Sequence, residues 1–307
     1  MAGRFKVRGV LGPLRRGGAD PAYRVADDGA VWRVSRTPEG PATLRVAAGP
    51  AGPAAEPLAA SAKAEAWGPG AEWLMARLPA LLGELDDPAP FVARHQVVAR
   101  AERQHPWLRL CRTGLVLESL IPSVLEQKVT TTEAYASWRH LVRKFGEPAP
   151  VPCGPGVPDG LYVMPDARTW ALIPSWEWHL ANVDGKRSAT VVRAARVAAR
   201  LEEAAGMPYE QAKARLEAVP GIGPWTSAET LQRSNGAPDA LTVGDLHLPG
   251  IVGYALTGRR GATDADMLEL LAPYAGQRHR AVRLILLTGL TPPRRAPRLA
   301  PGRISHL

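Results

Sequence analysis

Cysteine is nearly absent from this chain, which has only Cys111 and Cys153 among its 307 residues. Two thiols are too few for the four thiolates of an iron-sulfur cluster, and their separation gives no Cys-x-x-Cys metal spacing. Long apolar runs are also missing: none approaches a membrane span, and residues 1–12 contain no apolar stretch of secretory length. We therefore expect two reduced thiols, no iron-sulfur cluster or other cofactor, no metal held by side chains, and a cytoplasmic protein.

Lysine is scarce as well, because only six of the 38 basic residues are Lys. The net charge is nevertheless +9 and the isoelectric point is near 10.0. Such a balance suits a polyanionic partner, since Lys and Arg neutralise phosphates. Codon bias towards G and C would also enrich Arg, Ala, Gly and Pro, so the charge alone does not establish DNA binding.

The chain changes character near residue 95. Before it, short β-prone runs at residues 5–10, 30–36, 43–47 and 61–67 are separated by Gly, Pro and Asp, and a helical pattern follows at 72–82. After it come amphipathic helices, expected at residues 117–125, 130–145, 165–172, 188–205, 249–256, 263–271 and 279–287. The fold class expected is mainly α with an N-terminal α+β domain: an antiparallel sheet domain at 1–94, a helical domain at 95–290, and a disordered basic tail at 291–307.

The most informative stretch, residues 216–226, reads Leu-Glu-Ala-Val-Pro-Gly-Ile-Gly-Pro-Trp-Thr. Pro220 and Gly221 end one helix, and Pro224 suits the first turn of the next. We expect Gly221 and Gly223 to adopt positive φ, so that backbone N-H groups and a helix N-terminus can approach a phosphate. The alternative is an ordinary αα-hairpin with a glycine stop.

Asp245 follows about twenty residues later, in a Gly-Asp-x-His context ahead of a Pro-started helix. Together with the hairpin, it makes the stretch resemble the helix-hairpin-helix DNA glycosylase superfamily, especially the DNA-3-methyladenine glycosylase II branch. The resemblance implies that the hairpin grips double-stranded DNA and that its carbonyls near Val219 and Ile222 can carry a structural Na⁺ or K⁺ ion. The hairpin residues expected at the DNA are Val219, Gly221, Ile222, Gly223 and Thr226.

Asp245 matches the aspartate that serves the chemistry in that superfamily. Breaking an N-glycosidic bond passes through an oxocarbenium-like state, which a carboxylate stabilises while it orients or deprotonates a water. The alternative role for Asp245 is capping the helix that follows. Superfamily members that also cut the backbone have a lysine where this chain has Trp225, and a tryptophan cannot form a Schiff base. The resemblance therefore implies a monofunctional enzyme, with Trp225 packed beside the carboxylate and shaping the pocket.

The resemblance also implies roles for residues in two further regions. The turn after residues 117–125 matches the segment that fills the gap left by a flipped base, which places Lys128 at the wedge and Gln127 beside it near the pocket. The alternative for Lys128 is a solvated side chain at a helix end. In the pocket, Glu229 replaces an aromatic residue of the best-known members, and residues 279–287 supply no aromatic side chain.

The function expected is a monofunctional, monomeric and nucleoid-associated DNA glycosylase that removes damaged, foremost alkylated, purines in base excision repair. The weakly aromatic pocket leaves deaminated or bulkier bases open. The rival from another class is a non-catalytic DNA-binding or lesion-recognition protein that keeps the hairpin without the chemistry. The arginines at 193, 196 and 200 are expected to form a solvated face.

Overall fold

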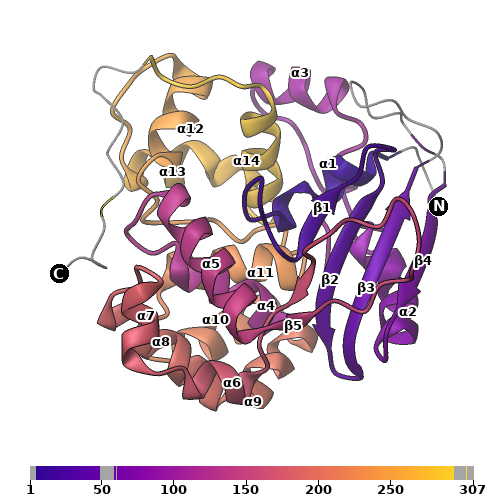
Figure 1. Ribbon diagram of the computed structural model, residues 1–307. Coiled ribbons are helices and arrows are strands. Elements are labelled where there is room, and N and C mark those ends of the chain that lie inside the picture. Colours follow the sequence, from indigo (N-terminus) through magenta and orange to yellow (C-terminus); the bar gives the residue numbers. More distant parts are fainter. Residues whose placement is uncertain (1–4, 49–58, 60, 294–301, 303–307) are drawn as a thin grey trace.

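The computed structural model describes residues 5–48, 59, 61–293 and 302. Its N-terminal part is a four-stranded antiparallel sheet in the order β1-β2-β3-β4, made of Tyr23–Val25, Val31–Thr37, Gly40–Ala47 and Lys63–Trp67 (Figure 1). Most of the tail predicted to be disordered, residues 294–301 and 303–307, lies outside the described residues.

The prediction of a strand at residues 5–10 is wrong. This segment forms helix α1 (Val7–Leu11), followed by a 3₁₀ turn η1 (Gly12–Leu14). Val7, Val10 and Leu11 are all buried, and their i, i+3, i+4 spacing is that of a helix face rather than of a strand. Sequence reasoning also missed the three-residue β1, which is too short to show an alternating pattern.

Helix α2 (Ala71–Leu81) was predicted at residues 72–82 and packs on the sheet, where it contacts β3 and β4. The core between them is apolar and includes Leu44, Val46, Leu74 and Leu81. A second apolar cluster joins β2 to the short strand β6 (Tyr162–Val163), the partner of β5 (Glu147–Pro148).

The remaining chain is helical, as predicted. Its helices are α3 (Gln96–Gln104), α4 (Val116–Leu125), α5 (Thr131–Phe145), α6 (Ala167–Leu172), α7 (Ser175–Leu180), α8 (Gly185–Arg196), α9 (Ala198–Glu202), α10 (Tyr209–Glu217), α11 (Pro224–Ser234), α12 (Leu248–Thr257), α13 (Asp264–Leu271) and α14 (Arg278–Leu287), with 3₁₀ turns η2 (Glu203–Gly206) and η3 (Ala272–Tyr274). A capping box of Thr130 and Glu133 starts α5, and Thr263 caps α13. The single helix predicted at 188–205 is instead broken at Val197, whose ψ of 21° leaves the helical region. Across the described residues, no helix is long and apolar enough to span a membrane.

The helices form two groups with separate cores. Helices α4 to α11 enclose one apolar cluster, whereas α3, α12, α13 and α14 enclose another. In Figure 1 the first group occupies the lower part of the molecule, the second the upper part, and the sheet the right. Helix α11 belongs to the first group, and the loop after it carries the chain into the second, so residues 235–247 run between two cores.

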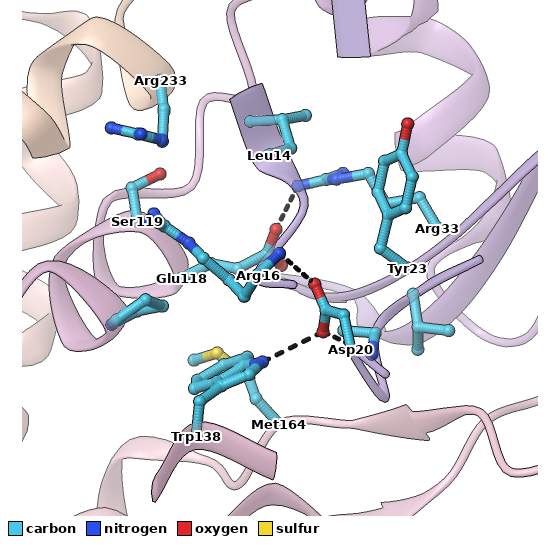
Figure 2. Close-up of a pocket in the computed structure, with 13 residues that line it drawn as sticks. Leu14, Arg16, Asp20, Tyr23, Arg33, Glu118, Ser119, Trp138, Met164 and Arg233 are labelled. Carbon is cyan, nitrogen blue, oxygen red and sulfur yellow. Dashed lines mark hydrogen bonds and ion pairs between the residues drawn. The ribbon is translucent and has the colours of Figure 1, made fainter. Parts of the chain in front are cut away.

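The sheet part meets the helices through buried charged groups (Figure 2). Asp20 accepts hydrogen bonds from the Arg16 backbone N-H (2.7 Å) and from the Trp138 indole N-H (3.0 Å), and Arg33 pairs with Glu118 of α4. Burial raises the pKa of both Asp20 and Glu118. The space among these side chains is about 30 Å³, which admits water but not a base. This cluster is therefore a structural joint between the two parts.

Candidate active site and DNA interface

Helices α10 and α11 are joined by the hairpin predicted from the sequence. The two glycines in it have different roles. Gly221 has a φ of +98°, and a Cβ there would lie 2.1 Å from Thr190 Oγ1 of α8, so this glycine is needed for packing inside the protein. Gly223 has a φ of −110°, open to any residue, and a Cβ there would meet nothing within 4 Å. The expectation of positive φ is right for Gly221 and wrong for Gly223.

The apolar side chains of the hairpin face inward. Val219 and Ile222 are 8% and 5% exposed and belong to the core of the first helix group, and Thr226 is 2% exposed. We therefore expect these residues to contact DNA through their backbone atoms and not through their side chains. The N-H groups of Gly223, Trp225 and Thr226 donate to no described residue, as is usual at an uncapped helix N-terminus. These donors lie at the start of α11, where they are available to bind an anion.

Side chains from the turn after α4 and from α8 hold the hairpin. The Gln127 amide donates to the Gly221 carbonyl (3.0 Å) and to Thr226 Oγ1 (2.8 Å), and Arg193 donates to the Pro220 carbonyl (3.0 Å). Gln127 is therefore a brace for the hairpin, and it does not line the cavity described below, contrary to its predicted place in the pocket. Arg193 is likewise not part of a purely solvated face.

Lys128 is exposed in the turn between α4 and α5 and has a φ of +55°. Left-handed backbone is uncommon for a residue with a side chain and costs energy that the surroundings must supply. The neighbouring Gln127 ties this turn to the hairpin. Lys128 is thus presented beside the hairpin in a fixed turn, which is compatible with the wedge predicted for it.

Asp245 lies in the loop before α12, and both of its oxygens are engaged. Oδ2 accepts from the Trp225 indole N-H at 3.0 Å, and Oδ1 accepts from the backbone N-H groups of His247 and Leu248, each at 2.8 Å. The capping role that the sequence left as an alternative is therefore real and coexists with the position expected of a catalytic carboxylate. Trp225 lies beside that carboxylate, as expected, although its side chain does not line the cavity.

A cavity of about 380 Å³ opens beside Asp245, within the range of small-molecule sites. It lies among α11, α14, the loop before α12 and the segment at Arg109, and Val10 and Pro13 of the N-terminal part close one side. Its charged lining consists of Arg109, Glu229, Arg233, Asp245 and Arg283, and none of the described residues that line it is Trp, Tyr or Phe. Glu229 thus lies in the pocket, as predicted, and it is paired with Arg233 at 2.7 Å.

Burial sets the protonation of two further groups in the cavity wall. It holds the pKa of His279 well below the ordinary value, and the positive charges of Arg283, Arg233 and Arg280 act in the same direction. It also raises the pKa of the Cys111 thiol. At neutral pH the wall therefore presents a neutral imidazole and an uncharged thiol next to guanidinium groups.

No family model matches the chain. Two curated relatives from strains of Mycobacterium tuberculosis, each described as a probable bifunctional transcriptional activator/DNA repair enzyme AlkA, are 31% identical to it over 144 residues. These residues make up 47% of the chain, and the chain spans only 28% of the length of those relatives.

Solved structures match over far more of the molecule. A 3-methyladenine DNA glycosylase from Archaeoglobus fulgidus superposes with a TM-score of 0.70 at 16% identity, covering 93% of this chain and 96% of that one. The fold is that of the helix-hairpin-helix DNA glycosylases. An 8-oxoguanine glycosylase/lyase from Clostridium acetobutylicum, in complex with DNA, gives 0.65 at 11% identity, covering 94% and 92%. A 3-methyladenine DNA glycosylase from Schizosaccharomyces pombe, bound to abasic DNA, gives 0.52 at 18%, covering 64% and 94%.

The glycosylase fold confirms the predicted fold class and brings together residues that the sequence did not single out. Arg233, His279 and Arg283 all line the cavity, from α11 and α14. Glu229 and Arg233 are four residues apart, the spacing of a helical ion pair, which could have indicated Arg233. His279 and Arg283 carry no such signal, because a buried polar residue on an apolar helix is visible only once its neighbours are known.

Proposed function

We propose that this protein is a monofunctional DNA glycosylase that turns a damaged purine out of double-stranded DNA and hydrolyses its N-glycosidic bond. The observation that supports this best is the arrangement around Asp245. The carboxylate is held by the Trp225 indole and by the start of α12, at the edge of a cavity of base-binding size. Alkylated purines are the first substrates to test, because 3-methyladenine is named for neighbours of the same fold.

In this mechanism the hairpin binds a phosphate of the lesion strand through the free N-H groups at the start of α11. Lys128 fills the gap left by the flipped base. The C1′–N9 bond breaks with its electron pair leaving on the base, and Asp245 faces the positive charge that develops on the sugar. A water adds to C1′ and gives its proton to the Asp245 carboxylate, from which the proton passes to solvent, leaving an abasic site.

Trp225 occupies the position where bifunctional members of the superfamily have a lysine. An indole has no amine that could attack C1′, so the strand should remain uncut. One chain supplies the hairpin, the carboxylate and the cavity, and we propose that it acts as a monomer associated with the nucleoid.

We also propose that a Na⁺ or K⁺ ion sits on the hairpin carbonyls near Val219 and Ile222. The Val219 carbonyl accepts from the Ile222 N-H, whereas the Ile222 carbonyl accepts from no described residue and is available to an ion. Such an ion would add positive charge beside the phosphate. DNA affinity should then be higher in KCl than in tetramethylammonium chloride at equal ionic strength.

The test of the main proposal is base release from duplex oligonucleotides with a single lesion, run over a panel of alkylated and deaminated purines. We expect free base and an abasic strand that breaks only after alkali treatment, with no adduct trapped by borohydride. A protein that binds these duplexes and releases no base would instead be the non-catalytic DNA-binding protein.

A further inference from the structure

Arg283 is a positive charge without a partner inside the cavity. It is half-buried on α14, lines the cavity wall, and makes no hydrogen bond or ion pair with any described residue. Its neighbours on the same helix are paired: Arg278 with Asp239, and Arg280 with Asp86. Burial lowers the pKa of Arg283, although a guanidinium stays protonated in proteins. A desolvated cation without a partner is costly, and such costs are typical of functional sites.

Three other charged groups of the cavity, Glu229, Arg233 and Asp245, already have hydrogen-bond or ion-pair partners. Glu229, the carboxylate on the facing helix, pairs with Arg233, which also donates to the Pro13 carbonyl. The Asp245 oxygens accept from Trp225 and from the start of α12. His279 is neutral, for the reasons given above, and the Cys111 thiol is uncharged. The cavity lining thus contains three guanidinium groups and two carboxylates, so the net charge of its side chains is positive.

We propose that Arg283 binds the damaged base directly and selects a neutral purine with a carbonyl oxygen, such as a deaminated or oxidised purine, over cationic alkylpurines. This inference rests on the proposed glycosylase function and narrows its substrate class. A guanidinium donates hydrogen bonds and accepts none, so it matches a carbonyl oxygen. The same charge repels a purine that alkylation has made cationic, and this repulsion is strong where water is excluded. The absence of aromatic rings removes the stacking and cation-π contacts that would favour an electron-poor base.

The chemistry of the leaving base fits the same class of substrate. A cationic purine leaves as a neutral molecule and needs no help, whereas a neutral purine takes the bonding electron pair and leaves as an anion. Its negative charge spreads from N9 over the ring to the carbonyl oxygen. Arg283 at that oxygen stabilises the departing anion, which then takes a proton from water. No general acid is required in the cavity, which is consistent with the neutral His279.

The experiment compares three lesions in one duplex sequence under single turnover. Hypoxanthine is neutral and has a carbonyl, 1,N6-ethenoadenine is neutral and has none, and 7-methylguanine is cationic. Each is tested with the parent, with Arg283→Gln, and with the matched control Arg278→Gln on the same helix, whose side chain lies outside the cavity. Rates are corrected for spontaneous loss of each base, and thermal unfolding checks that each variant folds.

We expect the parent to release hypoxanthine fastest. Arg283→Gln should slow hypoxanthine on the order of ten- to a hundredfold, the effect of a lost charge-assisted hydrogen bond, and leave 7-methylguanine equal or faster. Arg278→Gln should leave all three rates near the parental values. A parent that prefers 7-methylguanine, or an Arg283→Gln variant with parental hypoxanthine rates, would overturn the inference and leave the glycosylase function standing. Release of no base at all would refute the glycosylase function, and this inference with it.

Discussion

The indole N-H of Trp225 donates to Asp245 Oδ2 at 3.0 Å and so links the first turn of α11 to the loop before α12. This bond joins a residue of one helix group to a carboxylate at the edge of the other. The opposite oxygen is fixed by two backbone N-H groups at the start of α12. The carboxylate is therefore held in one orientation in the free protein, and in the proposed reaction its rotamer would not have to be selected.

Replacing Trp225 by Phe tests that orientation. The ring keeps most of its volume and loses the N-H, so the protein should fold and bind DNA as before. Hydrogen bonds to charged groups are worth about 1.5 to 3 kcal/mol, which predicts a single-turnover rate at least about tenfold lower. An unchanged rate, with the substrate saturating, would mean that the backbone of α12 positions Asp245 alone.

Asp245→Asn tests the chemistry. The amide oxygen can still accept from the His247 and Leu248 N-H groups, so α12 keeps its cap and the protein should fold. The amide NH2 then faces the Trp225 N-H and loses that hydrogen bond, so the melting temperature should fall somewhat. Removing the negative charge that faces the oxocarbenium should cost on the order of 3 kcal/mol or more, roughly a hundredfold in rate. DNA affinity, measured by anisotropy, should persist or rise, since one negative charge near phosphates is gone. Base release at the parental rate would remove Asp245 from the mechanism.

The two glycines of the hairpin allow DNA binding to be separated from folding. Gly223→Val is compatible with the backbone at that position and meets no protein atom, so the variant should fold. Its side chain should block a phosphate at the start of α11 and lower affinity for damaged and undamaged duplex alike. Gly221→Val serves as the contrast, because strain at φ +98° and the clash with Thr190 should lower stability itself. Parental DNA affinity of a folded Gly223→Val protein would show that the hairpin is not the DNA contact.

How far the sequence predicts this molecule depends on how local each signal is. The hairpin between α10 and α11 and the contact between Trp225 and Asp245 depend on short stretches of chain, and both were predicted correctly. The catalytic role of Asp245 stays a prediction. The cavity is not local: it combines Val10, Glu229 and Arg283 from three distant segments. The bracing by Gln127 and Arg193 was missed for the same reason. Gly223 was misjudged because a glycine in sequence does not reveal whether its φ is positive.

Lys128 allows a test in which stability and activity move in opposite directions. Lys128→Gly relieves the left-handed backbone at φ +55°, so it should raise the free energy of unfolding, by about 1 kcal/mol. It also removes the side chain proposed to fill the gap in the base stack, so base release from duplex should slow, and release from single strands much less. Lys128→Ala separates the two effects, because it removes the side chain and keeps the strain. If both variants released base from duplex DNA at the parental rate, Lys128 would be a solvated surface side chain with no role as a wedge.

His279 predicts how stability depends on pH. Burial and the nearby arginines hold its pKa well below that of the unfolded chain, which is about 6.5. Below pH 6.5 the unfolded state therefore binds a proton that the folded state does not. The contribution of His279 to the free energy of unfolding must then fall as the pH is lowered through this window, by at most about 1.4 kcal/mol per pH unit. The buried carboxyls of Asp20 and Glu118, whose pKa values are raised, act in the opposite direction. His105 has a smaller effect in the same direction, because its pKa is also lowered by burial and by Lys6, but it is more exposed. Urea unfolding between pH 5 and pH 7.5 should therefore show a larger loss of stability at low pH in the parent than in His279→Gln. The matched His105→Gln variant should keep most of it. A parental slope that His279→Gln leaves unchanged would mean that the imidazole is protonated in the folded protein, which would place one more positive charge beside Arg283.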